Sequence, residues 1–302
     1  MSKRIVYMDG KFIPEAEAKV SIYSLDVMQA AAAFEMTRSF RGVQFKLLEH
    51  IERLYQSCTL LGIPWPDGNI ESLCAEVVAR NDHGPGEEHR LLIVVSPGCA
   101  PMYKDLAGVI PHPFVYIADF PLRYTVAGFS KYFTDGVHCV TSQIQQVPDA
   151  CVPSAAKHRS RLHFHLAQQQ APAGTWPLLL CPHPDLPQSA YMVTEAPGAN
   201  ICFVEEGVVH VCDVQALHGI SMQTVIDLCH VQPTAWAYLD RLLHASEVWL
   251  TGTPFCMLPV VSIDRKPIGD GKIGPVYTAT LQKWSEMVGV DIQQQIMDWD
   301  RA

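Results

Sequence analysis

Three separated segments carry residue types that together could hold an aldehyde cofactor. Lys157 follows two prolines at the start of a predicted helix, Glu195 follows Thr194 at the end of a predicted strand, and Gly219-Ile220-Ser221 begins another predicted helix. A lysine amine can form a Schiff base, a carboxylate can keep a ring nitrogen protonated, and a helix N-terminus can bind phosphate. Singly, these features are more often plain caps or solvated strand ends, so only the combination predicts a cofactor site.

Other motifs in the chain favour competing sites only weakly. The pattern Gly-x-Gly-x-x-Gly at 269–274 is followed by too little chain for a dinucleotide-binding unit, so we interpret it as a loop. His158, His163 and His165 lie near Lys157, but a helix would spread them over different faces and no nearby acid completes a ligand set. We therefore predict no metal site.

Composition limits the classes of partner and compartment. The chain has 302 residues with a net charge of −9 and no basic run, so nucleic acid is not expected as a partner. No apolar run approaches the roughly 18 residues that a membrane span needs. Ten cysteines occur without a Cys-x-x-Cys pair, and no apolar stretch follows the basic residues near the N-terminus. These features predict free thiols and a cytoplasmic protein.

The elements that must position these residues alternate between strands and helices. Asp9-Gly10 predicts a two-residue turn within a hairpin over 5–13. Further strands are predicted at 31–40, 90–96, 114–118, 136–142, 176–181, 191–194, 200–205, 208–212 and 247–251. Helices are predicted at 45–61, 70–80, 157–170, 221–230 and 278–287. This alternation favours an α/β fold with mixed layers.

Residues 121–135 lack clear periodicity and are interpreted as a link between two halves. We accordingly predict a small N-terminal α/β domain over 1–122, an interdomain linker over 123–135, and a larger cofactor-binding domain over 136–302.

Seven sequence blocks, in order, resemble the class IV family of pyridoxal-phosphate-dependent aminotransferases. The blocks are Phe34-Glu35-x-x-Arg38, the helix segment Glu49–Ser57 with Arg53, Lys157, Thr194-Glu195 with Asn200, Leu217-x-Gly219-Ile220-Ser221, Glu247 with Gly252-Thr253, and Gly274-Pro275. The resemblance covers nearly the whole chain. It implies fold type IV, two domains with the active site between them, and a homodimer.

The resemblance also implies roles for individual residues. Lys157 would carry pyridoxal 5'-phosphate as a Schiff base and shuttle the catalytic proton, and Glu195 would face the pyridine nitrogen. Arg53 and the start of the helix at Gly219 would bind the phosphate. The full set of implied cofactor-binding residues is Arg53, Lys157, Glu195, Asn200, Leu217, Gly219, Ile220, Ser221, Gly252 and Thr253.

Departures from the family pattern bear on the substrate. Branched-chain enzymes have an N–H after the Gly-Thr turn that meets the substrate carboxylate, whereas Pro254 has none. The arginine and histidine trap of D-amino-acid enzymes is also absent, because Ala100-Pro101 is followed by Met-Tyr-Lys. We interpret Phe34, Arg38, Lys104, Arg159 and Pro254 as candidate substrate-binding residues.

The expected reaction is transfer of an amino group between an amino acid or small amine and a 2-oxo acid. One alternative is a lyase that eliminates pyruvate, because Lys157-His158-x-x-Arg161-Leu162 resembles aminodeoxychorismate lyase. The other alternative is an inactive protein that keeps the fold and binds the cofactor. Intact Lys157, Arg53 and Glu195 argue against the inactive protein.

Overall fold

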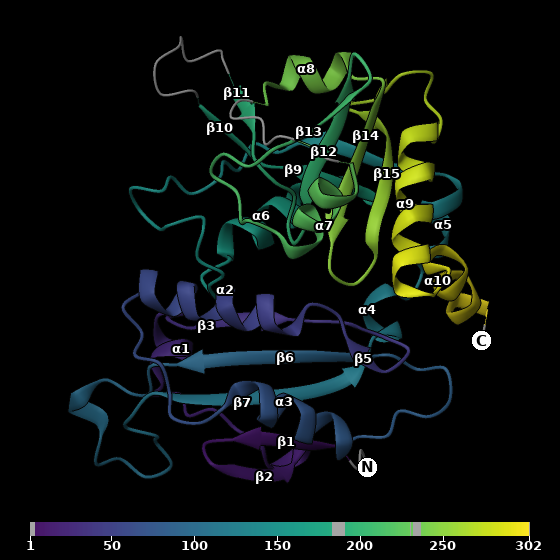
Figure 1. The fold of residues 1–302 in the computed structure, drawn as a ribbon. Helices are drawn as coiled ribbons and strands as arrows, with labels where there is room; N and C mark the ends of the chain where they lie inside the picture. The colour runs from purple at the N-terminus through teal and green to yellow at the C-terminus, as the bar shows by residue number, and fades with distance from the viewer. Residues whose placement is uncertain (1–3, 183–190, 230, 232–236, 302) are drawn as a thin grey trace. The chain divides into compact units, whose positions relative to one another are not determined.

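The structure is a computed structural model that describes residues 4–182, 191–229, 231 and 237–301 (Figure 1). It divides into two compact units. The first comprises Met1–Thr125 together with Ala156–Arg161, and the second comprises Val126–Ala155 together with Leu162–Ala302. The predicted division differs from these units in one functional respect, because the Lys157 segment belongs with the N-terminal unit. Residues predicted as a linker also contain two short helices, α4 Arg123–Val126 and α5 Ser130–Thr134.

The first unit is built on a five-stranded sheet with the order β2-β1-β7-β6-β3. Its neighbouring strands pair antiparallel. The strands are β1 Ile5–Met8, β2 Lys11–Pro14, β3 Ala33–Met36, β6 His89–Ser96 and β7 Phe114–Pro121. The hairpin between β1 and β2 turns at Asp9 and Gly10, whose φ angles are 46° and 79°. Both angles lie in the left-handed region that this turn requires, which confirms the prediction.

Two helices, α2 Leu47–Leu60 and α3 Ile70–Ala79, pack against this sheet. Leu54 and Cys58 of α2 and Val77 of α3 are buried in one core with Leu91 and Ile117 of the strands. The apolar periodicity predicted both helices, because one stripe of each must leave water. The strand predicted over 31–40 is interrupted, and its end forms a small separate ribbon of β4 Ser39–Phe40 and β5 Val43–Gln44.

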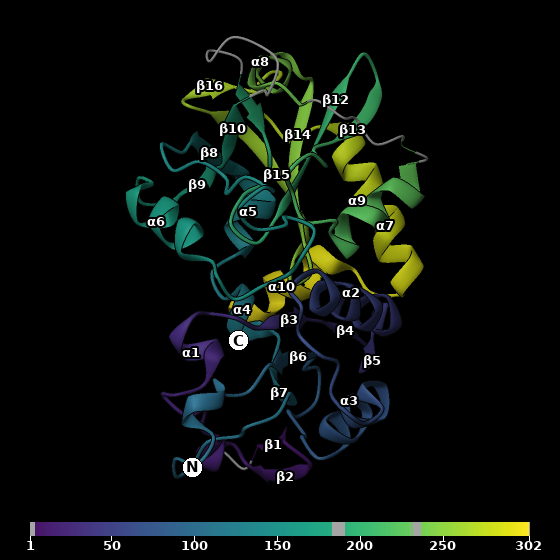
Figure 2. The same cartoon turned by 90° about the vertical axis from the view of Figure 1, so that its left-hand side faces the viewer.

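The second unit contains a seven-stranded sheet with the order β13-β12-β14-β15-β8-β9, and β16 pairs with β15 (Figure 2). Its strands are β8 Val137–Thr141, β9 Thr175–Leu178, β12 Asn200–Glu205, β13 Val208–Val211, β14 Glu247–Gly252, β15 Cys256–Ile263 and β16 Lys266–Pro267. Strand β8 runs parallel to β9 and β15, and the other pairs are antiparallel. Strands β10 Leu180–Pro182 and β11 Tyr191–Val193 form a pair of their own.

The helices of this unit are α6 Leu162–Gln170, α7 Ile220–Cys229, α8 Leu239–His244, α9 Pro275–Val288 and α10 Ile292–Arg301, besides α5. Helices α7 and α9 pack on β14, whose Trp249 and Leu250 are fully buried. The family block at Gly274-Pro275 has a structural role here. Both oxygens of the Glu247 carboxylate accept hydrogen bonds from the first backbone N–H groups of α9, those of Val276 and Tyr277.

Several elements differ from the sequence prediction. The helix predicted from Lys157 begins only at Leu162, because the backbone of 157–161 bonds elsewhere. Strand β15 was missed, since Pro259 in its middle argues against a central strand. Helices α8 and α10 were also missed. The predicted helix end at 230 lies outside the described residues.

No helix in the described part of the chain is both long and apolar enough to span a membrane.

Candidate active site

Lys157 is held by two elements of the first unit. Its backbone N–H donates to the Ser57 hydroxyl of α2 at 3.0 Å, and its carbonyl accepts from the Phe34 N–H of β3 at 3.0 Å. The neighbouring Arg159 N–H donates to the Ala32 carbonyl. The segment therefore follows β3 as an added extended stretch, which is why no helix forms at the lysine. The lysine Nζ lies 4.9 Å from the centre of the Phe34 ring.

Arg53 of α2 is clamped by a fully buried carboxylate. Its Nε lies 2.7 Å from Oε1 of Glu35, and its Nη2 lies 2.9 Å from Oε2. His50, one turn earlier, places Nδ1 2.7 Å from Glu35 Oε2. Burial alone would raise the pKa of Glu35, but the charge of Arg53 and the hydrogen bond to His50 lower it well below its ordinary value of 4.5. The ionised Glu35 thus fixes the orientation of the guanidinium fork.

Three cations surround one aromatic ring near Lys157. The guanidinium of Arg159 lies 4.5 Å from the Phe34 ring centre and that of Arg161 lies 5.5 Å from it, so both share this ring with Lys157. Burial raises the pKa of the neighbouring Tyr116, and the charge of Arg159 opposes this rise. The structure therefore brings Phe34 and Arg159, two predicted substrate residues, to the lysine.

The other cationic candidates are placed differently. Arg38 is only 1% exposed, with its guanidinium 3.7 Å from the Phe40 ring centre and its Nε donating to the Ser39 carbonyl. Lys104 is exposed at the end of a short 3-10 turn, Pro101–Tyr103. Arg38 therefore packs against Phe40, and Lys104 lies at an exposed position.

Glu195 in the second unit is buried and tied to a loop by a glutamine. The Gln146 amide donates to Glu195 Oε1 at 2.7 Å and to the Gln215 carbonyl at 2.9 Å. The Asn200 amide donates to the Leu217 carbonyl at 2.6 Å, so the loop before α7 is held at two points. Sequence reasoning missed Gln146, because a lone glutamine in a loop carries no motif.

The start of α7 has the features of a phosphate site. Ile220 and Ser221 begin this helix of ten residues, whose first N–H groups have no partner within the helix. Gly219 leaves room for Asn200, since a Cβ there would lie 2.0 Å from Asn200 Oδ1. The backbone thus approaches Asn200 more closely than any side chain would allow.

The turn after β14 adds hydroxyl groups to the same unit. Thr251 pairs in register with Asn200, and a Cβ at Gly252 would lie 2.6 Å from the Phe255 ring. Among the described residues, the buried Thr251 hydroxyl has no hydrogen-bond partner. Thr253 and Pro254 follow and are half-buried. Backbone N–H groups and hydroxyls that can donate to a phosphate, with a carboxylate that can accept from a ring N–H, together fit a phosphorylated pyridine cofactor.

Comparison with known proteins identifies the family. The model of the class IV amino-transferases matches residues 32–263. The chain belongs to this family. It is similar to the D-alanine aminotransferase of Bacillus licheniformis, with 27% identity over 281 residues that cover 90% of this chain and 92% of the relative.

Solved structures agree on the fold. A branched-chain amino acid aminotransferase from T.th., solved with N-(5'-phosphopyridoxyl)-L-glutamate, superposes with a TM-score of 0.79 at 27% identity, covering 99% of this chain and 98% of that one. The Escherichia coli branched-chain enzyme has a TM-score of 0.80 at 22% identity, with 95% of each chain covered, and shows the fold alone. The predicted family, fold type IV, aminotransferase class and pyridoxal 5'-phosphate cofactor are thereby confirmed.

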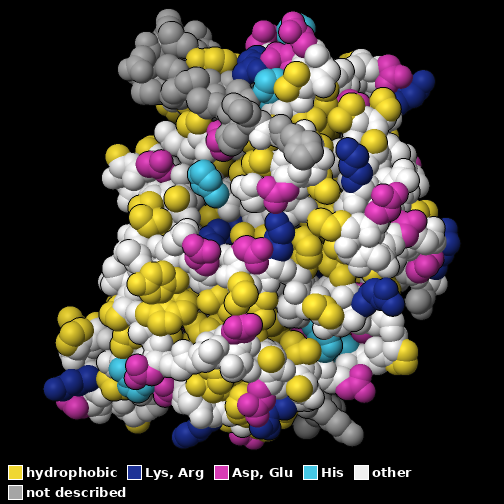
Figure 3. All heavy atoms as spheres, in the orientation of Figure 1, with side chains coloured by type: hydrophobic (Ala, Val, Ile, Leu, Met, Phe, Trp, Pro, Cys, Tyr) yellow, Lys and Arg dark blue, Asp and Glu magenta, His cyan; other side chains and the backbone are white. Residues whose placement is uncertain are grey.

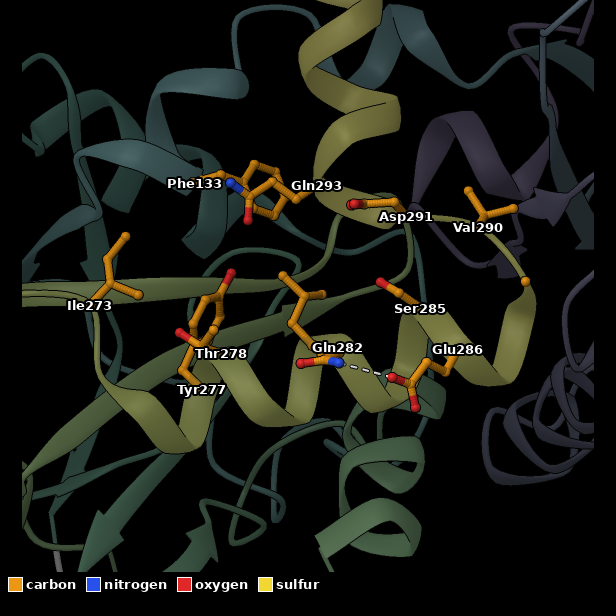
Figure 4. A pocket seen from close by; sticks show the side chains of 12 residues that line it. Phe133, Ile273, Tyr277, Thr278, Gln282, Ser285, Glu286, Val290, Asp291 and Gln293 are labelled. Carbon is orange, nitrogen blue, oxygen red and sulfur yellow. Dashed lines mark hydrogen bonds between the residues drawn. The ribbon is translucent and has the colours of Figure 1, made fainter.

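The second unit also contains a pocket. Figure 4 shows it between α9, which contributes Tyr277 and Gln282, and residues of α5 and α10, Phe133 and Gln293. Within the described part of the chain, its lining includes none of the predicted cofactor residues.

Proposed function

We propose that this aminotransferase moves an amino group between an amino acid, or small amine, and a 2-oxo acid, with Lys157 as the attachment point of the cofactor. The observation that carries the proposal is the placement of Lys157. Ser57 and β3 fix its backbone, and its amine lies beside the Phe34 ring, which the Arg159 guanidinium also contacts. A lysine held in this way can present its amine to a carbonyl carbon and later exchange a proton with the substrate.

The remaining residues bind and tune the cofactor in this proposal. When bound, pyridoxal 5'-phosphate supplies an electron sink for the carbanion formed at the substrate carbon. Glu195, held by Gln146, keeps the ring nitrogen protonated. Arg53, oriented by Glu35, contributes a charged fork to the phosphate. In the second unit, the α7 N-terminus with Ser221, together with Thr253, contributes N–H and hydroxyl donors. Asn200, Leu217, Gly219, Ile220 and Gly252 shape the backbone of this second-unit donor set.

We infer that Arg159 compensates for the missing N–H at Pro254 by binding a substrate carboxylate. Arg159 shares the Phe34 ring with Lys157, whereas Arg38 is buried in local contacts and Lys104 is exposed. A donor without a carboxylate would not need this contact. Ordinary branched-chain amino acids should therefore be poorer donors than in enzymes that retain the N–H.

The test is a rate panel of L-leucine, L-glutamate, D-alanine and simple aryl amines, each with and without a 2-oxo acid acceptor. Transamination requires the acceptor. Oxo-acid release without an acceptor would instead support the pyruvate-eliminating alternative, and no turnover of any donor would support the inactive binding protein. Undiminished use of L-leucine and L-glutamate would contradict the role given to Pro254.

We further propose a homodimer located in the cytoplasm. The first unit carries exposed apolar side chains, among them Ile22 at 72%, Leu48 at 60% and Tyr55 at 54% exposure. Figure 3 shows hydrophobic side chains gathered on one face of the molecule. Such a patch is typical of a covered interface. The ten cysteines, all described, form no disulfide, which supports a reducing compartment.

A further inference from the structure

Three side chains of the first unit converge at a place that the proposed function does not use. His89 begins β6, Asp119 lies in β7, and His83 lies in the loop after α3. His89 pairs in register with Pro121, so Asp119, two residues earlier, is its diagonal neighbour on the same sheet face. The loop from α3 then brings His83 to the same carboxylate.

The polar atoms of this cluster lie close together and away from water. His89 Nδ1 is 2.7 Å from Asp119 Oδ2, and His83 Nε2 is 3.1 Å from the same oxygen. The side chains of Asp119, His83 and His89 are 0%, 4% and 15% exposed. One ligand atom from each residue lies within 4.8 Å of the other two.

The protein alone does not satisfy the hydrogen-bonding capacity of this cluster. Among the described residues, Asp119 Oδ1 is buried without a hydrogen-bond partner, and His83 Nε2, although 3.1 Å from Asp119 Oδ2, forms no hydrogen bond. Buried polar groups normally have partners, and an unpaired buried carboxylate oxygen is costly. Both atoms belong to the group that converges on Asp119, so one ion bound by the Asp119 carboxylate and by His83 Nε2 would give both side chains a partner.

We propose that His83, His89 and Asp119 bind one Zn²⁺ ion. Two imidazole nitrogens and one carboxylate oxygen form a donor set that Zn²⁺ prefers, with a water as the fourth ligand. Bonds of about 2.0–2.2 Å in a tetrahedron place ligand atoms roughly 3.4 Å apart. The observed separations of 2.7 and 3.1 Å are near that value, so small side-chain rotations would admit the ion. The ion would tie the loop after α3 to β6 and β7.

The test compares Zn²⁺ binding by the full-length enzyme and three variants. The protein is treated with a chelator, separated from it, and titrated calorimetrically with Zn²⁺. We expect one ion per chain in the wild type, and a loss of affinity of roughly tenfold or more in His83→Gln and in Asp119→Asn. The matched control is His112→Gln. His112 also meets an aspartate, Asp9, at 2.9 Å, but that pair is exposed and has no second histidine.

X-ray absorption of the zinc-loaded protein provides a second readout. We expect a shell of nitrogen and oxygen ligands with the outer scattering of two imidazoles, and this signal should persist in His112→Gln. If the buried Asp119→Asn variant fails to fold, the result for His83→Gln decides whether the site binds zinc. His83 lies in a loop, so its substitution should disturb folding less. Absence of stoichiometric Zn²⁺ binding in the wild type, or unchanged binding in His83→Gln, would overturn the proposal and leave a hydrogen-bonded His–Asp–His cluster.

Discussion

At the scale of single residues, the proposed attachment of the cofactor to Lys157 can be tested directly. Reduction with borohydride followed by peptide mass spectrometry should place the cofactor adduct on Lys157. Lys157→Ala should still bind the cofactor non-covalently but lose turnover, because the amine that exchanges the proton is gone. The exposed Lys104 offers a control, and Lys104→Ala should keep the adduct on Lys157. An adduct on any other lysine would refute the assignment.

Kinetic measurements should distinguish the role of Glu195 from that of Gln146. Glu195→Gln should retain the cofactor but slow the carbanion step, because the ring nitrogen loses its ionised partner. Gln146→Ala removes a hydrogen bond to a charged group, worth about 1.5–3 kcal/mol, and should lower kcat by roughly ten- to a hundredfold if Glu195 must be held in place. Gln146→Glu, with no amide donor, should not restore the rate. A change in KM alone for Gln146→Ala would show that it does not position Glu195.

Glu35 should give the protein a specific sensitivity to acid. Its pKa in the folded chain is lowered from the ordinary value of 4.5, so its ion pair with Arg53 stabilises the fold fully only above that value. That contribution should fade as the pH falls below this value towards the lower folded pKa. Urea unfolding of the wild type and of Glu35→Gln, both without cofactor, should show a stability gap that is constant near neutral pH and narrows below about pH 4. A gap independent of pH would contradict the ionised state of Glu35.

Arg53→Ala should damage stability as well as cofactor binding. If Arg53 binds the phosphate as proposed, its removal should weaken cofactor affinity by about ten- to a hundredfold. Removing it also leaves the buried Glu35 charge unpaired, which costs about 3–5 kcal/mol of unfolding free energy. Denaturant titration of the cofactor-free protein measures the second effect alone. If the cofactor-free Arg53→Ala variant is as stable as the wild type, the buried charge of Glu35 does not depend on Arg53 for its stabilisation.

At the scale of elements, the loop and the helix start at Gly219 are packed closely against Asn200. Gly219→Ala places a Cβ where Asn200 Oδ1 lies, so it should displace either the loop or the Asn200 amide from Leu217. We expect cofactor affinity to fall by about tenfold or more, with little change in helical content. Gly207→Ala, in an open turn with φ of 78°, is the control for backbone strain and should leave cofactor affinity unchanged. Equal affinity in both variants would show that the close approach is not needed.

At the scale of the whole molecule, the exposed apolar face of the first unit bears on assembly. Leu48 and Tyr55 are seven residues apart on α2 and both are more than half exposed. If the protein is a homodimer through this face, Leu48→Glu should shift it towards monomer in analytical ultracentrifugation, because a charge would be buried without a partner. Val208→Glu, at an exposed position of β13 in the second unit, is the control. A monomeric wild type would remove the basis for the proposal.

Local patterns in the sequence were sufficient to predict much of the fold and the identity of the cofactor. The Asp9-Gly10 turn, the apolar stripes of α2 and α3, and the buried run of β6 depend on neighbouring residues, so they can be predicted without the tertiary structure. The ordered family blocks likewise indicated a class IV enzyme and its cofactor, because each block keeps the residue types that the chemistry requires.

Only the tertiary structure decided how residues far apart in the chain meet. Lys157 was predicted on a helix, yet its backbone bonds to Ser57 and β3, and such long-range hydrogen bonds leave no periodic signal. The same reason hid the Glu35–Arg53 clamp, the bridge from Gln146 to Glu195, and the cluster around Asp119. Each of these joins polar groups that are buried together, and burial is set by the packing of whole elements.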